Sequence, residues 1–457
     1  MQIIHILVNC NYLKMKASYA MVMNMQSSSV APDSYAPRIV DAKIKKYLQL
    51  FGAVEISGTK WCGKTWSSLA HAASVTYVDR GANLQISTAD PTYPLAGERP
   101  HVIDEWQRVP AIWDSVRHAV DELPGEKGAW ILTGSSTPNK GEIAHSGAGR
   151  IGRIRMHPMT LQESGDSTGK ASLSKLFMGE FEPSQCPNGI ENLAEIAVRG
   201  GWPEERSRSA ADAQIVVREY LESVFEQSVP KLGGDGFLAR RLALSLARNL
   251  GQSAKASTLA RDVYAGGSDE TLSESERKSL SRHLDILGRL FLVDEVPGWV
   301  PASRSPQRMR VKPKRYFADP SIAAALLGLS PAALLQDWQT FGLMFENLVM
   351  RDLDVYVRSL DYATSNPLRY YHDDSGLEAD AIIERADGSW AAIEVKVGLD
   401  KIDDAASNLR RVQKKVCANE KAHVREPSFL AVVTGMGEAA YRRSDGVYVI
   451  PIRALGA

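Results

Sequence analysis

The chain of 457 residues is longer than a single hydrophobic core can support, so about two to four domains are expected. Hydrophobic residues make up 44% and charged residues 24% of the composition, which is that of an ordinary globular protein and indicates neither long disorder nor a fibrous repeat. Lysine plus arginine and aspartate plus glutamate both number 54, so the net charge is zero and any surface for nucleic acid must be local.

Residues 1–37 are predicted to form a flexible leader, because regular patterning begins only near Arg38. The opening stretch is fairly apolar, but polar residues such as Asn9 and Lys14 interrupt it and no basic segment precedes it. Neither a signal peptide nor a membrane span is therefore expected. Four cysteines are widely spaced: Cys10, Cys62, Cys186 and Cys417. Because none of them forms a Cys-x-x-Cys pair, a cytoplasmic location is predicted.

Residues 38–160 alternate short apolar runs with segments of helical spacing. The apolar runs predict five strands, at 53–58, 74–79, 101–106, 129–136 and 153–159. Between them, TWSSLAHAA and PAIWDSVRHAVDEL carry apolar residues at helical spacing, and Pro110 stands at a favoured first-turn position. Strands that alternate with helices in this way indicate a doubly wound α/β domain with a parallel sheet.

A phosphate-binding loop, or P-loop, is predicted directly after the first of these strands. The pattern G-x-x-x-x-G-K-[ST] is matched by Gly58, Thr59, Lys60, Trp61, Cys62, Gly63, Lys64 and Thr65. The glycines allow the loop to curl so that its backbone N–H groups face phosphates. Lys64 would reach the β and γ oxygens of ATP, and the Thr65 hydroxyl would bind Mg²⁺. A chance Gly-Lys turn at a strand end is the alternative.

Further candidates for the nucleotide site follow later strands. Asp104 and Glu105 end the third strand at the carboxyl edge of the sheet, where Asp104 would hold Mg²⁺ and Glu105 would orient the attacking water. Ser135 would sense the γ-phosphate, with a simple turn as the alternative. Arg150, or alternatively Arg153, would stabilise charge on the transferred phosphoryl group, in trans if the chain forms a homo-oligomer. Surface arginines without this role are common.

Residues 161–230 are predicted to form a helical lid, and residues 231–330 a winged-helix-like region. The second range reads as a short helix STLARDVY, a longer helix SESERKSLSRHLDILGRL and a strand FLVDEV, followed by a strongly basic segment. Phosphate contact is the natural use of such a segment. The candidate DNA contacts are Lys278, Arg282, Arg308, Arg310, Lys312 and Lys314. A lid or protein-docking role, with a solvated basic loop, is the alternative.

Residues 331–457 are predicted to form a smaller α/β domain that resembles the PD-(D/E)xK nuclease core. Asp380 in the strand ADAIIE precedes Glu394 and Lys396 in the strand WAAIEVK with the spacing Asp-x₁₃-Glu-x-Lys. Asp380 and Glu394 would bind Mg²⁺, Glu346 on the preceding helix would complete the site, and Lys396 would stabilise the scissile phosphate. A degenerate domain that binds nucleic acid without cleaving it is the alternative.

These motifs together resemble bacterial and archaeal AAA-type ATP-binding proteins that carry a C-terminal domain of unknown function called DUF4143. The segments that carry the resemblance are PRIVDAKIKKYL, GTKWCGKTW, VIDEWQRVP, LTGSS, GAGRIGRIRMHPMTLQES, RGGWPE, KPKRYFADPSIAAALLG and FGLMFENLV. The resemblance covers nearly everything after Tyr35. It implies an N-terminal AAA-like ATPase, a winged-helix-like region and a nuclease-like terminal domain.

The sequence therefore predicts a Mg²⁺-dependent enzyme that hydrolyses ATP to ADP and phosphate and is associated with DNA. The alternative is a slow nucleotide-dependent switch that binds DNA or a protein partner without motor or nuclease activity. A toxin–antitoxin or defence adaptor is a third, nonenzymatic hypothesis. The assay that separates the first two measures phosphate release with and without DNA.

Overall fold

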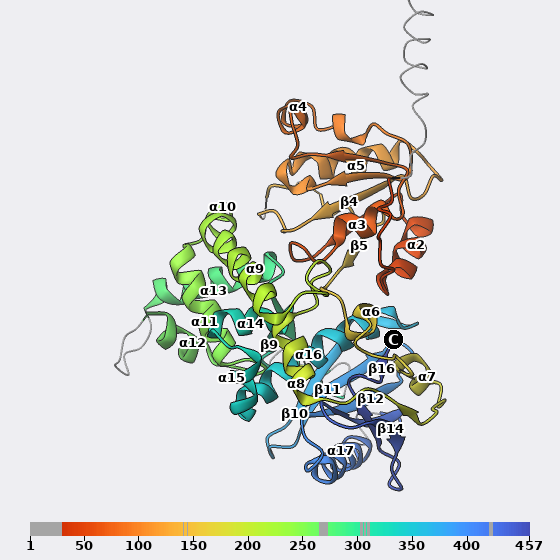
Figure 1. Cartoon of the computed structure of the whole chain (residues 1–457). Helices are drawn as coiled ribbons and strands as arrows, with labels where there is room; N and C mark the ends of the chain where they lie inside the picture. Colours follow the sequence, from red (N-terminus) through yellow and green to blue (C-terminus); the bar gives the residue numbers. More distant parts are fainter. Residues whose placement is uncertain are drawn as a thin grey trace, which may run out of the picture.

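The computed structural model describes residues 30–457 except 140, 144, 265–272, 302–304, 306–307, 309–310 and 420–423. Figure 1 shows an N-terminal α/β domain, a region built mostly of helices, and a C-terminal α/β domain beside that region. Most of the predicted leader, residues 1–29, lies outside the described residues. Within the described ranges, no helix has the length and apolar character that crossing a membrane requires.

The N-terminal domain is a parallel sheet of five strands in the order β2-β3-β4-β1-β5. The strands are β1 (Ala53–Ser57), β2 (Ser74–Tyr77), β3 (His101–Asp104), β4 (Trp130–Gly134) and β5 (Ile151–Arg155). The principal helices are α2 (Val40–Leu50), α3 (Lys64–Leu69), α4 (Asn83–Ala89) and α5 (Ala111–Asp121), with short 3-10 helices η1 (Tyr93–Leu95) and η2 (Trp106–Arg108). The predicted α/β fold with a parallel sheet is confirmed.

Alternating side chains of this sheet enter two separate cores. Val54 and Ile56 of β1 pack with Ile44 of α2 on one face. On the other face, Ile103 of β3 packs with Trp113 of α5. Because the sheet is covered on both faces, every residue of the central strands β3 and β4 is buried.

The central region contains eight helices, one π-helical turn and one two-stranded sheet among its described residues. They are α8 (Ile190–Arg199), α9 (Ala210–Ser223), η3 (Val224–Ser228), α10 (Val229–Lys231), α11 (Gly236–Arg248), α12 (Ala256–Tyr264), α13 (Glu274–Arg289), β8 (Val293–Val296), β9 (Lys314–Phe317), α14 (Pro320–Leu327) and α15 (Pro331–Gln336). A capping box of Ser273 and Glu276 starts α13. The antiparallel pair β8–β9 follows α13, in the order expected for a winged helix.

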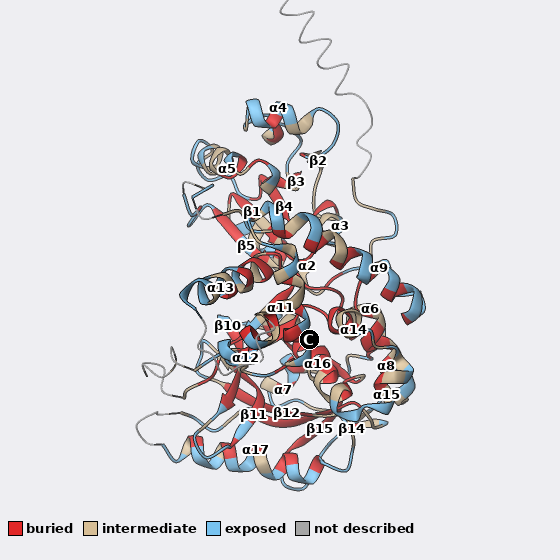
Figure 2. Cartoon of the chain, turned by 90° about the vertical axis from the view of Figure 1, so that its left-hand side faces the viewer, coloured by how far each residue is buried: buried red, intermediate tan, exposed pale blue. Residues whose placement is uncertain are grey.

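The C-terminal domain is a mixed sheet of seven strands in the order β10-β11-β12-β13-β15-β14-β7, in which β7 (Ser184–Gln185) comes from an earlier part of the chain. Its elements are α16 (Trp338–Ser359), β10 (Ala363–His372), β11 (Glu378–Arg385), β12 (Trp390–Lys396), α17 (Ile402–Cys417), β13 (Phe429–Thr434), β14 (Ala439–Arg442), β15 (Tyr448–Pro451) and β16 (Leu455–Gly456). Figure 2 shows that β11 and β12 are largely buried, whereas α17 exposes its outer face. All strands that were predicted for this domain are present.

The first part of the predicted lid contributes to the C-terminal domain. It contains α6 (Leu161–Ser164), β6 (Ala171–Ser172), α7 (Leu173–Phe177) and β7 (Ser184–Gln185). Strand β7 pairs with β14, and β6 pairs with β16. A purely helical lid does not account for these strands, which are two residues long and therefore too short to show a periodic pattern.

A buried ion-pair network joins the central region, the C-terminal domain and the segment that follows the N-terminal domain. Arg351 of α16 donates to Asp319, which precedes α14, at 2.7 Å and to its neighbour Asp352 at 2.7 Å. The backbone N–H of Gly201 donates to Asp319 at 2.9 Å, and that of Leu161 donates to Asp352 at 2.9 Å. One guanidinium thus orders two carboxylates that in turn fix two distant backbone segments.

We expect Arg351→Met to destabilise the protein strongly, because it leaves two carboxylates buried without a counter-charge. Removing one partner of a buried ion pair costs about 3–5 kcal/mol. The measurement is the free energy of unfolding from urea denaturation. The control is Lys278→Met, which breaks the exposed pair with Glu274 and should cost less than about 1 kcal/mol. Similar losses in the two variants would contradict the prediction.

Candidate functional site

The P-loop lies at the carboxyl end of β1, as predicted, and its two glycines are required by its geometry. A Cβ added at Gly58 would stand 2.1 Å from the carbonyl oxygen of Met156. Gly63 has φ 98°, in the region that favours glycine. The loop is therefore curled tightly against the residue that follows β5. Within it, Thr59 and Cys62 are buried and the side chains of Lys60 and Trp61 are exposed.

The residues predicted to hold the phosphates and Mg²⁺ meet at this edge of the sheet. Lys64 is buried, and its Nζ donates to the carbonyl oxygen of Thr59 at 2.6 Å. The Thr65 hydroxyl donates to Oδ1 of Asp104 at 2.9 Å, and the Thr133 hydroxyl also donates to Asp104. A hydroxyl and a carboxylate side by side are oxygen ligands of the kind Mg²⁺ takes in such sites, so the residues present fit this cation.

Glu105 is held in a strained backbone conformation beside Asp104. Its φ of 58° and ψ of 39° are left-handed, which is uncommon for a residue other than glycine. Its carboxylate accepts from Gln107 Nε2 at 2.6 Å and from the Ser135 hydroxyl at 3.2 Å. Strain of this kind concentrates at functional sites. Gln107 was not predicted as a site residue, although it lies within the segment VIDEWQRVP.

The two arginines predicted to stabilise the transferred phosphoryl group, Arg150 and Arg153, do not contact the P-loop of their own chain. Arg150 precedes β5 and therefore stands at the amino edge of the parallel sheet, opposite the P-loop. It forms an exposed ion pair with Asp121 at 2.9 Å. Arg153 is within 3.5 Å of Glu55. Arg150 is thus not brought together with Lys64 or Asp104, and a contact with phosphate would require a second copy of the chain.

Two further residues connect the P-loop to other parts of the protein. The ring of Trp61, itself at φ 63°, lies 5.2 Å from the ring of Tyr220 on α9. Arg38 donates to the carbonyl oxygen of Cys62 at 2.8 Å and to that of His157 at 2.9 Å. Neither Arg38 nor Tyr220 was predicted as a site residue. Arg38 falls in the segment PRIVDAKIKKYL, but its role depends on partners far along the chain.

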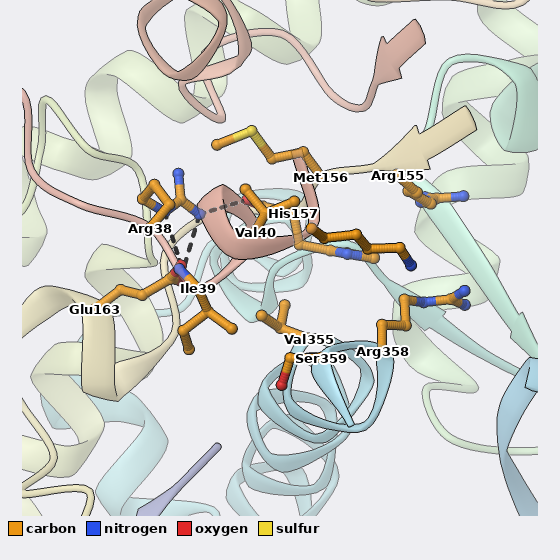
Figure 3. Close-up of a pocket in the computed structure, with 11 residues that line it drawn as sticks. Arg38, Ile39, Val40, Arg155, Met156, His157, Glu163, Val355, Arg358 and Ser359 are labelled. Atoms are coloured by element: carbon orange, nitrogen blue, oxygen red, sulfur yellow. Dashed lines mark hydrogen bonds and ion pairs between the residues drawn. The ribbon is translucent and has the colours of Figure 1, made fainter. Parts of the chain in front are cut away.

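A charged junction lies below the P-loop domain, around the small cavity shown in Figure 3. Arg38 pairs there with Glu163 at 2.9 Å. Next to it, His157 lies 3.0 Å from Asp294 of β8 and 3.6 Å from Asp354 of α16. Although burial alone would raise it, the pKa of Asp294 is held below its ordinary value by the charges of Arg155 and His157. The residues after β5 thus contact both other regions.

The four residues predicted for the nuclease-like site are brought together in the C-terminal domain. Lys396 Nζ lies 2.8 Å from Glu394 and 3.7 Å from Asp380. Asp380 also accepts from the backbone N–H of Val395 at 2.8 Å. Burial and the neighbouring charge of Asp380 raise the pKa of Glu346 to about 7 and that of Glu394 to about 8.

A lysine from another region enters this carboxylate cluster. Lys314 of β9 lies 3.4 Å from Glu346 and 3.8 Å from Asp380. The hydroxyl of Tyr316, on the same strand, donates to Glu346 at 2.6 Å. Among the described residues, no group of three or more acidic, histidine or cysteine side chains is placed to hold a metal ion. In this arrangement the cluster therefore does not fit Mg²⁺.

The structure corrects two of the predicted DNA contacts. Lys314 is buried among carboxylates, and Arg308 pairs with Glu384 of β11 at 2.6 Å, so neither presents its charge to a partner. The reason is that both find acidic side chains far away in the sequence. Arg310 lies outside the described residues. Lys278, Arg282 and Lys312 are exposed.

Comparison with protein families assigns the N-terminal and the C-terminal α/β domain each to a family. Residues 51–165 match the AAA domain family, and residues 341–455 match a domain of unknown function, DUF4143. The chain is an AAA-type ATP-binding protein with a C-terminal DUF4143 domain. In this AAA–DUF4143 protein, residues 190–333 match a further domain of unknown function, DUF8612. That match spans most of both ranges that were predicted as a lid and a winged-helix-like region.

Two mycobacterial proteins are similar to the AAA–DUF4143 protein. Uncharacterized proteins of Mycobacterium bovis and Mycobacterium tuberculosis are each 24% identical to it over 351 residues, which cover 75% of this chain and 70% of theirs. Two solved structures overlap with it more loosely. They are a Walker-type ATPase of Pyrococcus abyssi (11% identity, TM-score 0.37, 66% of this chain and 99% of that one) and the ORC1 protein of Aeropyrum pernix in complex with DNA (14%, 0.25, 68% and 98%). Overlaps of this quality support no conclusion about function.

We expect Thr65→Val to remove the dependence of ATP affinity on Mg²⁺, because valine keeps the shape of threonine but lacks the hydroxyl beside Asp104. Loss of such a contact weakens metal binding by roughly 10–100-fold. Calorimetric titration with ATP, in Mg²⁺ and in EDTA, measures the effect. Ser68→Ala, which removes a buried hydroxyl from the same helix, should leave the difference between the two conditions intact. An unchanged Mg²⁺ effect in Thr65→Val would count against Thr65 as a ligand.

Proposed function

We propose that the AAA–DUF4143 protein hydrolyses ATP to ADP and phosphate in a Mg²⁺-dependent reaction. The observation that carries this proposal is the hydrogen bond of 2.9 Å between Thr65 of the P-loop and Asp104 of the neighbouring strand. These two residues stand where a hydrolytic P-loop site needs its cation ligands. Membership of the AAA domain family supports the same conclusion.

Each residue of the site has a distinct part in this reaction. The backbone of the loop from Gly58 to Gly63 would hold the phosphates, and Lys64 would exchange its contact with the Thr59 carbonyl for phosphate oxygens. Mg²⁺, bound through Thr65 and Asp104, would neutralise charge on the phosphate oxygens. Glu105 would leave Gln107 and Ser135 to orient the attacking water and accept its proton.

We expect Glu105→Gln to retain ATP but to lower phosphate release by about 100-fold or more, because glutamine cannot accept the proton of the attacking water. Lys64→Ala should lose both ATP binding and phosphate release, because no ammonium remains beside the phosphates. The measurements are calorimetric ATP binding and phosphate release with and without DNA. Glu122→Gln, an exposed carboxylate at the end of α5, is the matched control. Equal, slow release by wild type and Glu105→Gln would favour the nucleotide-dependent switch.

A DNA-associated role rests on the central region and the C-terminal domain. Helices α11, α12 and α13 followed by the pair β8–β9 have the order of a winged helix, and α13 exposes Lys278 and Arg282. The order α16, β10, β11, β12, α17, β13 in the C-terminal domain, with Glu346 and Asp380 close together, supports a PD-(D/E)xK-like fold. We propose that α13 contacts DNA phosphates and that the protein is cytoplasmic. If Arg150 contacts the nucleotide bound to the P-loop of a neighbouring copy, the protein acts as a homo-oligomer.

We expect Lys278→Ala and Arg282→Ala each to weaken binding of duplex DNA to a similar extent for all sequences. Each loss of a phosphate contact should also reduce the slope of log affinity against log salt concentration by about one. Fluorescence anisotropy with labelled duplexes over a range of salt concentrations measures both quantities. Lys170→Ala, an exposed lysine remote from α13 in the sequence, serves as control. Unchanged slopes in both α13 variants would exclude this helix as the DNA surface.

A further inference from the structure

The two features that would serve DNA chemistry, a basic segment and a carboxylate cluster, are paired with each other in this structure. The basic segment runs from residue 304 to residue 315. Two of its described cations reach acidic side chains of the C-terminal domain. Arg308 contacts Glu384, and Lys314 contacts both Glu346 and Asp380. These two charges of the segment are thus paired within the chain.

Lys314 occupies the space between the two carboxylates that a divalent cation would bridge. Its Nζ is 3.4 Å from Glu346 on α16 and 3.8 Å from Asp380 on β11. The ammonium also lies 5.4 Å from the centre of the Tyr370 ring. With only 9% of the residue exposed, Lys314 has exchanged its water shell for these contacts. A buried ammonium is stable only where carboxylates replace that water.

The segment that precedes Lys314 is attached to the C-terminal domain by hydrogen bonds as well. The N–H of Trp299 donates to the carbonyl oxygen of Tyr370 at 2.6 Å, and the N–H of Tyr370 donates to that of Pro297 at 3.2 Å. The Tyr370 hydroxyl donates in turn to the carbonyl oxygen of Lys312. These bonds attach both ends of the segment between β8 and β9 to strand β10. The segment that leads to Lys314 is therefore held on β10 independently of the Lys314 charge.

The charges around the cluster show why a metal and Lys314 exclude each other. Three carboxylates, Glu346, Asp380 and Glu394, face two ammonium groups, those of Lys314 and Lys396. A divalent cation between Glu346 and Asp380 would stand in contact with the Lys314 ammonium, where like charges repel strongly in a buried site. Withdrawal of Lys314 would remove one positive charge from beside Glu346 and Asp380, which favours the binding of another cation there.

We propose that Lys314 is the resident cation of the carboxylate cluster and keeps divalent metal out while β9 is docked. The carboxylate cluster is then closed to metal in this conformation, and it opens only when Lys314 leaves Glu346 and Asp380. The proposal goes beyond ATP hydrolysis and does not depend on it. It assigns to one lysine the role that a metal plays in the open nuclease-like site.

The test measures Mn²⁺ binding to the full-length, nucleotide-free protein by electron paramagnetic resonance of the free ion. Lys314→Met should take up one more Mn²⁺ per chain than wild type, with at least tenfold higher affinity for that ion. The additional site should disappear in the double variant Lys314→Met/Asp380→Asn. Lys312→Met, which removes an exposed lysine from the same segment, should bind Mn²⁺ as wild type does. ATP affinity should be equal in all variants, which separates this test from the P-loop.

Two results would overturn the proposal. One is a folded Lys314→Met protein without the additional Mn²⁺ site, which would mean that the cluster is a structural ion pair. The other is Mn²⁺ binding by wild type that Asp380→Asn abolishes, because the site would then be open with Lys314 present. This second comparison does not need the Lys314 variant, so it decides the matter even if that variant fails to fold. Wild type and Asp380→Asn with equal Mn²⁺ uptake is the expected result.

Discussion

The guanidinium of Arg351 is the constraint on which the arrangement of the chain depends. It is fully surrounded, pairing with Asp319 and Asp352, and these carboxylates accept backbone N–H groups of Gly201 and Leu161. Burial of such a group is tolerated only if every charge finds a partner. The network therefore holds three segments against one turn of α16. They are the segment that follows the N-terminal domain, the turn between α8 and α9, and the start of α14. Segments of the family resemblance that are far apart in the sequence meet at this point.

The nucleotide site is connected to this centre through the residue range that follows β5. Arg38 holds the carbonyl oxygens of Cys62 in the P-loop and of His157 after β5, and it pairs with Glu163. His157 in turn lies against Asp294 of β8 and Asp354 of α16. The P-loop is thus connected through Arg38 and His157 to the central region and to the C-terminal domain. The P-loop, β8 and α16 are joined by a continuous series of polar contacts.

Local chemistry made much of the nucleotide site predictable from the sequence. The P-loop is contiguous, and Asp104 ends a strand whose neighbours could be recognised by their apolar runs. The distance of Arg150 from the P-loop could also have been predicted from the sequence. A residue that precedes a parallel strand lies at the amino edge of the sheet, whereas the P-loop lies at the carboxyl edge. Gln107 and Arg38 could not be assigned, since their roles depend on Glu105 geometry and on contacts across more than a hundred residues. Strands β6 and β7 were missed because two residues show no period.

The basic segment shows a general limit of reading charge from sequence. A run of cations without acids indicates a phosphate surface only if no carboxylates arrive from elsewhere in the fold, and a neutral chain has as many acids as bases. Here Arg308 and Lys314 meet Glu384, Glu346 and Asp380, all of which lie beyond residue 340. Lys278 and Arg282 differ from these two residues because they are exposed on α13, although Lys278 also pairs with Glu274 at the surface. Exposure, rather than local charge density, therefore separates the surfaces that can meet a nucleic acid from those that hold the domains together.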